Sequence, residues 1–162
     1  MLRRAALALT MIFLLSGCDE IDDMLHHIDT SKITAAPSAN NSGSMWGANN
    51  NPNCVASITE VKYECTKGTV TDPSGKTNRR AYNLAMTAKV TYDITRPNFY
   101  GTPYRADVVF DVMSKNDVVL RSVTTNVHLV ENGSSVPASA QIQDISPEEM
   151  AKIAKIQARW NY

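Results

Sequence analysis

The chain has no excess of charge of either sign. Its 162 residues include 16 Lys and Arg and 16 Asp and Glu, so the formal net charge is zero. Proteins that bind nucleic acid through its phosphates carry a basic excess, and this composition therefore argues against a nucleic-acid partner. Cysteine is also scarce, with three residues in the whole sequence.

Sequence motifs of known catalytic centres are missing as well. The chain contains no H-E-x-x-H, G-x-S-x-G or S-x-x-K pattern. Gly75-Lys76-Thr77 is similar to the end of a phosphate-binding loop, but position 70, where that loop requires glycine, is Val70. We therefore expect a protein that is not an enzyme, needs no cofactor and has no metal site or small-molecule substrate. A hydrolase site assembled from distant residues is the less favoured alternative.

A hydrophobic run long enough to cross a bilayer is absent too. Ala5 to Leu15 is a stretch of eleven apolar or small residues with one threonine, preceded by Arg3 and Arg4. A helix of that length is too short for a hydrocarbon core of about 30 Å, whereas it matches the core of a secretory signal peptide. We therefore predict that residues 1–17 are a signal peptide.

The apolar stretch ends in Leu15-Ser16-Gly17-Cys18, which resembles the lipobox of bacterial lipoproteins. The resemblance implies that the chain is cut before Cys18, that its sulfur receives a diacylglycerol and that the new amino terminus is acylated. Because two acyl chains already suffice for stable anchoring, the protein would remain on a membrane through Cys18. An ordinary secretory signal with an incidental cysteine is the alternative.

Asp19 refines the expected location. In enterobacterial lipoproteins, an aspartate directly after the lipidated cysteine resembles the signal for retention in the inner membrane. The resemblance implies a lipid-anchored protein of the inner membrane that faces the periplasm. If this sorting rule does not apply in the host, the outer membrane is the expected location.

Residues 18–53 are predicted to be a flexible tether that is acidic at first and then rich in Ser and Asn. Five acidic residues precede Lys32, and such a segment is repelled by anionic lipid. The polar stretches that follow contain too few large apolar side chains to order themselves. Trp46 interrupts them, either as a docking anchor for a partner or as a ring that rests on the domain or at the lipid interface.

Cys54 and Cys65 remain as a pair once Cys18 is assigned to the lipid. An even pair in an oxidising compartment is typical of a disulfide, which here would close a loop of about twelve residues. Such a loop stabilises the fold by about 2–3 kcal/mol on chain entropy. A redox pair would require a close C-x-x-C spacing, whereas ten residues intervene here. We therefore predict a structural disulfide.

From Cys54 onward, apolar and polar residues alternate. The clearest case is the nine residues from Leu84 to Tyr92. Similar alternation marks residues 61–65, 106–112, 123–129 and 136–142, with turn residues between them. The turns at 114–117 and 131–134 are short, so the strands that they connect are predicted to be antiparallel hairpin neighbours.

The carboxyl-terminal segment shows a different pattern. Ser146 followed by Pro147 and two glutamates is typical of a helix start. Apolar residues then recur every three or four positions as far as Trp160, which predicts a helix over residues 147–160. Its apolar stripe should pack on the sheet, and the alternative is a helix that binds a partner.

The residues 54–162 suffice for one domain, and short strands at regular spacing favour an antiparallel β-sandwich with this carboxyl-terminal helix. Residues 82–142 resemble the immunoglobulin-like domains of bacterial lipoproteins and late-embryogenesis-abundant proteins. The similar part is Pro103 to Asp111, followed by a turn and then Val118 to Ser122. The Cys–Trp–Cys core of antibody domains is absent. The resemblance implies a mainly β, immunoglobulin-like sandwich.

Aromatic residues suggest how such a domain would act. Phe99, Tyr100 and Tyr104 lie on a proline-flanked loop, where they either contact a partner or cover the end of the core. We expect a non-enzymatic protein-binding accessory module of an envelope or secretion assembly, whose partner is another envelope protein. The alternative is an inhibitor or immunity lipoprotein directed against an effector, a lysozyme or a phage. Lysozyme-inhibitor lipoproteins also carry Tyr-x-Cys, as Tyr63-Glu64-Cys65 does, but their Ser-Gly-x-x-Tyr loop has no counterpart here.

Overall fold

The computed structural model describes residues 28–46, 52–71, 73–75, 78–97 and 103–161, with backbone only at positions 45, 46, 52, 78 and 79. The described chain is mainly β, as predicted. Its elements are η1 (Thr30–Lys32), β1 (Thr34–Pro37), β2 (Ser42–Trp46), β3 (Pro52–Thr71), β4 (Asn78–Ile94), β5 (Tyr104–Ser114), β6 (Val119–Leu129), β7 (Ser135–Ile145), α2 (Pro147–Met150) and β8 (Ile153–Trp160). No helix among the described residues is long and apolar enough to span a bilayer.

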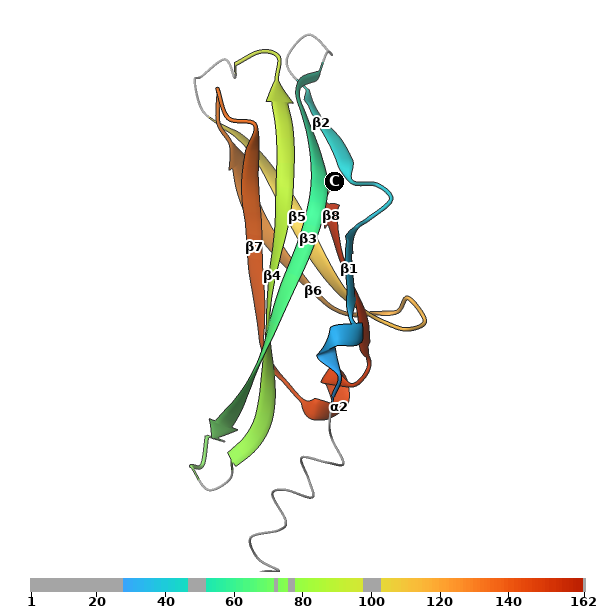
Figure 1. Cartoon of the computed structure of the whole chain (residues 1–162). Coiled ribbons are helices and arrows are strands. Elements are labelled where there is room, and N and C mark those ends of the chain that lie inside the picture. The colour runs from blue at the N-terminus through green and yellow to red at the C-terminus, as the bar shows by residue number, and fades with distance from the viewer. Residues whose placement is uncertain (1–27, 47–51, 72, 76–77, 98–102, 162) are drawn as a thin grey trace, which may run out of the picture.

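The strands form two four-stranded sheets that share one hydrophobic core (Figure 1). Sheet A has the order β1-β8-β5-β6, and sheet B has the order β2-β3-β4-β7. Neighbouring strands are antiparallel except β1 and β8, which are parallel. The strand order places β8 and β5 in the middle of sheet A, and β3 and β4 in the middle of sheet B.

The alternation of apolar and polar residues over 84–92 predicted the strand β4 correctly. Leu84, Met86 and Val90 are fully buried, whereas Thr87 and Lys89 between them are exposed. Because successive side chains of a strand point to opposite faces, one face of β4 contributes to the core and the other meets solvent. β5 supplies the facing layer through Val108, Phe110 and Val112.

The longest strands, β3 and β4, extend beyond the rest of sheet B. The pairing of β4 with β7 ends at Tyr82 opposite Ile145, while β3 and β4 remain paired as far as Thr71 opposite Asn78. Residues 68–71 and 78–81 therefore form a two-stranded distal ribbon. The ribbon projects from the end of the molecule at which η1 and α2 lie (Figure 1).

The described part of the predicted tether is ordered. Residues 34–37 pair with β8 and residues 42–46 pair with β3, so this segment passes from sheet A to sheet B. The Asn41 carbonyl accepts hydrogen bonds from the Ile58 amide at 2.8 Å and from the Trp160 indole at 2.9 Å. The prediction of a tether reaching residue 53 was wrong for these residues, because backbone pairing and Asn41 compensate for the shortage of large apolar side chains.

The predicted carboxyl-terminal helix is also corrected. It begins where expected, with Ser146 Oγ accepting a hydrogen bond from the Glu149 amide, but α2 ends at Met150. Residues 153–160 form β8 instead, with Ile156 and Trp160 buried towards the core. The apolar residues of this segment fit the period of a helix and that of a strand. The strand forms because β1 and β5, on either side of it, supply the ladder hydrogen bonds.

Of the two predicted hairpins, one is confirmed and one is wrong. β5 and β6 pair as expected across the turn after Ser114. β6 and β7 belong to different sheets, so the segment 130–134 crosses between them. The crossing is fixed by Tyr92, whose hydroxyl donates to the Val130 carbonyl at 3.2 Å and whose amide donates to the Ser134 carbonyl at 3.0 Å.

The predicted disulfide between Cys54 and Cys65 was wrong. Both residues lie on the unbroken strand β3, where Cys54 pairs with Ile94 and Cys65 pairs with Leu84. At about 3.3 Å per residue their Cα atoms are roughly 36 Å apart, whereas a disulfide needs about 6 Å. Both thiols are free. Burial raises the pKa of Cys54 to about 11, with a further contribution from Asp93, and burial also raises the pKa of Cys65.

The first prediction concerns Gly133 in the crossing segment. A Cβ atom at this position would lie 2.0 Å from the Tyr92 hydroxyl oxygen. Gly133→Ala should therefore destabilise the protein by about 1–3 kcal/mol, as overpacking does in buried sites. Combining it with Tyr92→Phe should cost less than the sum of the two single changes, because the clashing hydroxyl is gone. Urea denaturation of the four proteins measures this coupling.

Gly68→Ala is the matched control, since a Cβ at Gly68 meets nothing within 4 Å. It should leave the midpoint of denaturation almost unchanged. If the Gly133 and Tyr92 effects are strictly additive, the described contact between these two residues is refuted.

The second prediction concerns the thiols. In the folded protein near pH 8, Cys65 should react with iodoacetamide before Cys54, because Cys54 is fully buried and its pKa is about 11. Cys54 should react only after unfolding in urea. Mass spectrometry with peptide mapping reads both rates. A Cys54–Cys65 disulfide, or equal rates in the folded state, would contradict the arrangement of β3.

Candidate functional site

Most residues singled out from the sequence as contact or anchor sites lie outside the described residues. This applies to Cys18 and Asp19, and to Phe99 and Tyr100. The backbone of Trp46 is described as the last residue of β2, opposite Pro52, but its side chain is not. The structure therefore brings none of these side chains together into a described site.

Tyr104, the remaining predicted contact residue, is described. It begins β5, is half-buried and packs against the hydrophobic core. Its hydroxyl donates a hydrogen bond to the Arg96 carbonyl at 3.1 Å. Tyr104 therefore ties the two described ends of its loop together and covers the end of the core, which was the alternative reading of this ring.

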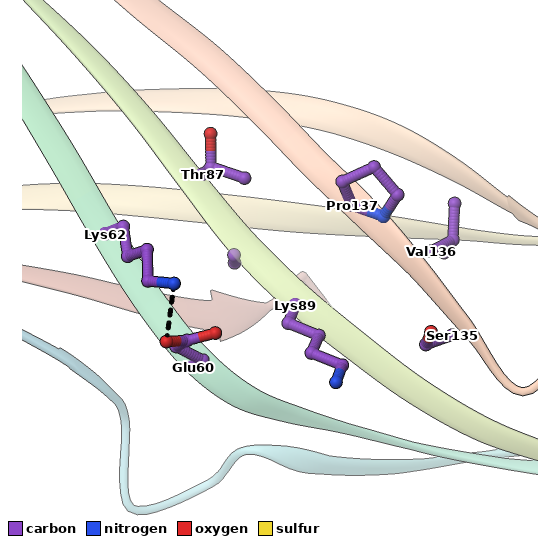
Figure 2. A pocket seen from close by; sticks show the side chains of 8 residues that line it. Glu60, Lys62, Thr87, Lys89, Ser135, Val136 and Pro137 are labelled. Atoms are coloured by element: carbon purple, nitrogen blue, oxygen red, sulfur yellow. Dashed lines mark ion pairs between the residues drawn. The ribbon is translucent and has the colours of Figure 1, made fainter.

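A hollow lies on the outer face of sheet B (Figure 2). Its volume is about 200 Å³. Three neighbouring strands supply its lining, which consists of Glu60, Lys62, Thr87, Ala88, Lys89, Ser135, Val136 and Pro137. The alternation of the strands explains the composition, because the outward positions of β3, β4 and β7 are mostly small or polar.

One wall of this hollow is an ion pair on β3. Lys62 Nζ lies 2.8 Å from Glu60 Oε1, and Lys89 stands on the neighbouring strand (Figure 2). Hydrogen bonding and charge from Lys62 lower the pKa of Glu60. Both side chains are well exposed, so the pair orients charges on the surface rather than holding a reactive group.

A second hollow lies at the base of the distal ribbon. Its volume is about 230 Å³. It is lined by Lys67, Gly68, Thr69, Arg80, Ala81 and Tyr82. Pockets that enclose a drug-sized molecule measure roughly 300–1,000 Å³. Both hollows are smaller than that.

Asp111 carries a buried carboxylate that the sequence pattern did not predict. It lies on the outer face of sheet A but is only 6% exposed. It accepts hydrogen bonds from Arg159 Nε at 2.6 Å and from the Ser122 hydroxyl. These partners come from the strands on either side, so the cluster joins β6, β5 and β8. The alternation predicted an outward Asp111 correctly, but no local signal indicated that long neighbours would cover it.

Metal-binding chemistry has no candidate among the described residues. No group of three or more His, Cys, Asp or Glu side chains in this part of the chain is arranged to hold an ion. His128 is exposed on β6, and His26 and His27 lie outside the described residues. The described surface offers charged and polar side chains on sheet faces, which can form hydrogen bonds and ion pairs with a partner.

Comparison with known proteins adds no relative. Neither a scan against protein-family models nor searches of curated proteins and of solved structures found a match.

Proposed function

We propose that the protein is a membrane-anchored periplasmic lipoprotein. The observation that carries this proposal is the Leu15-Ser16-Gly17-Cys18 motif directly behind an apolar segment with two preceding arginines. Lipid on Cys18 fixes the chain to the membrane, and Asp19 favours the inner membrane. The folded part then acts as a non-enzymatic protein-binding accessory module in an envelope or secretion assembly.

The described fold supports an arrangement in which one end of the domain faces the membrane. Ile28 packs against the core, and η1 follows it at the end of the molecule that carries α2 (Figure 1). Ile28 lies only ten positions after Cys18. A fully extended chain of that length spans at most about 36 Å. The domain is therefore held closer to the lipid than a tether of 36 residues would hold it.

The contact surface proposed for the partner is the outer face of sheet B. Its hollow is shallow, and its walls carry the Glu60–Lys62 pair and Lys89. Interfaces of non-obligate complexes have polar rims of this kind around small apolar centres, which Pro137 supplies here. A second envelope protein is the partner that these features fit.

We also propose that the domain is immunoglobulin-like in the broad sense. Two four-stranded sheets around one core, and a first strand parallel to the last, support this assignment. β3 and β4 form a hairpin within sheet B. Immunoglobulin domains divide their strands between the two sheets differently, so this domain would be a variant of that architecture.

The third prediction tests the anchor. Cys18→Ser should abolish incorporation of a radioactive fatty acid and release the protein from the membrane fraction, because the acylated sulfur is removed. Cys65→Ser is the matched control and should leave both properties unchanged. Label that persists on the Cys18→Ser protein refutes lipidation. In an enterobacterial host, Asp19→Ser should move the protein to the outer membrane in a density gradient.

The partner is identified by photo-crosslinking in cells. A photoreactive residue at Thr87, in the sheet B hollow, should capture one envelope protein, whereas the same residue at the exposed turn position Lys115 should not. Capture of an effector or lysozyme at Thr87 would instead favour the inhibitor or immunity role. Equal capture at both positions would refute the sheet B surface as the contact site.

A further inference from the structure

The edge of sheet A at β6 differs from the other described sheet edges. β6 is eleven residues long. One side of it pairs with β5, with Leu129 opposite Tyr104 at one end of the ladder, and no described residue pairs with its other side. β1 and β2 are short edges of four and five residues, and β7 contains Pro137. β2 pairs with β3 only from Pro52 to Ser57, so the outer side of Thr59–Thr71 is also without a described strand, but that stretch carries Glu60, Lys62, Glu64 and Lys67. Short strands, prolines and charged side chains discourage further strand pairing. β6 has no proline and only one permanently charged residue.

Exposed apolar side chains gather at the two ends of this edge. Among the described residues, four large hydrophobic side chains are exposed, and Val55 is the only one away from β6. Val118 and Val119 are 58% and 49% exposed at the beginning of β6, and Val130 is 50% exposed directly after its end. An edge strand with apolar side chains at both ends is a template for another strand.

The spacing of these residues is self-complementary. If two β6 strands pair antiparallel about a two-fold axis at Thr124, residues whose numbers sum to 248 face each other. Val118 then faces Val130 of the second copy, and Val119 faces Leu129, whose side chain is buried in the core of its own domain. Arg121, the strand's one permanently charged residue, faces Val127, so the register opposes no like charges.

We propose that β6 pairs with β6 of a second copy of this chain, in antiparallel orientation about Thr124. The two A sheets then form one continuous eight-stranded sheet. A second copy is favoured over a foreign strand because this register places the exposed Val118 and Val130 against each other twice, once at each end of the strand pair. A single strand pair buries little area, so the dimer is weak and concentration-dependent. The inference does not depend on the proposed lipid anchor or on the sheet B contact.

Valine substitutions at the two ends of β6 test the register. Val118→Lys with Val130→Lys places like charges opposite each other twice in the dimer, and should weaken dimerisation about tenfold. Val118→Lys with Val130→Glu places opposite charges there and should restore dimerisation at low salt. Sedimentation equilibrium measures the dimer dissociation constant. Because both valines are exposed, all variants should keep the thermal stability of the unmodified protein, which is checked by melting.

A thiol crosslink tests the position of the axis independently. In a background of Cys18→Ser and Cys65→Ser, Thr124→Cys should give a covalent dimer with a short bismaleimide. Thr87→Cys, in the middle of sheet B, is the control and should not. A protein that stays monomeric at millimolar concentration overturns the proposal. So does a dimer that the lysine pair leaves intact, or one in which both cysteines crosslink equally.

Discussion

The pairing of β8 on both of its sides is the constraint on which the rest of the fold depends. β8 lies between β5 and β1, so its backbone completes the ladders of both. Arg159 reaches from it to the buried Asp111, and the Trp160 indole donates to the Asn41 carbonyl. Removing Arg159 would leave a buried carboxylate without its cation, which costs more than the pair contributes when intact. The strand therefore fixes sheet A and the crossing of the amino-terminal segment together.

Other contacts close the ends of the two-sheet stack. At one end, Arg121 binds both carboxylate oxygens of Glu149, which joins β6 to α2 over the buried Met150. Nearby, the Tyr63 hydroxyl donates to the Thr30 carbonyl at 2.6 Å and holds the entry of the chain against β3. Bidentate arginine–carboxylate pairs restrict geometry as well as adding free energy. These contacts therefore hold the end of the two-sheet stack that carries η1 and α2 in place.

The sequence allowed the interior of the fold to be predicted better than its edges and its sites. Alternation identified β4 because Leu84 to Val90 bury one face only, and Ser146 with Pro147 located the start of α2. The strand β8 was missed because its apolar spacing fits two periods, and only distant strands decide between them. The disulfide prediction failed because the spacing of two cysteines in the sequence does not show that a single strand separates their thiols. Asp111 became a buried carboxylate through neighbours from β6 and β8, which no local pattern encodes.

The parallel pairing of β1 with β8 also affects the order in which the chain can fold. Thr34 pairs with Lys155, so nearly the whole sequence must be available before sheet A can close. Long-range contacts of this kind slow folding, because a large loop must be closed before its contacts contribute. Until then, the β3–β4 hairpin can form from local contacts while the edges of β1 and β5, which β8 later covers, stay open to pairing with other chains. A chain that emerges amino terminus first therefore cannot complete its fold until its last strand is free.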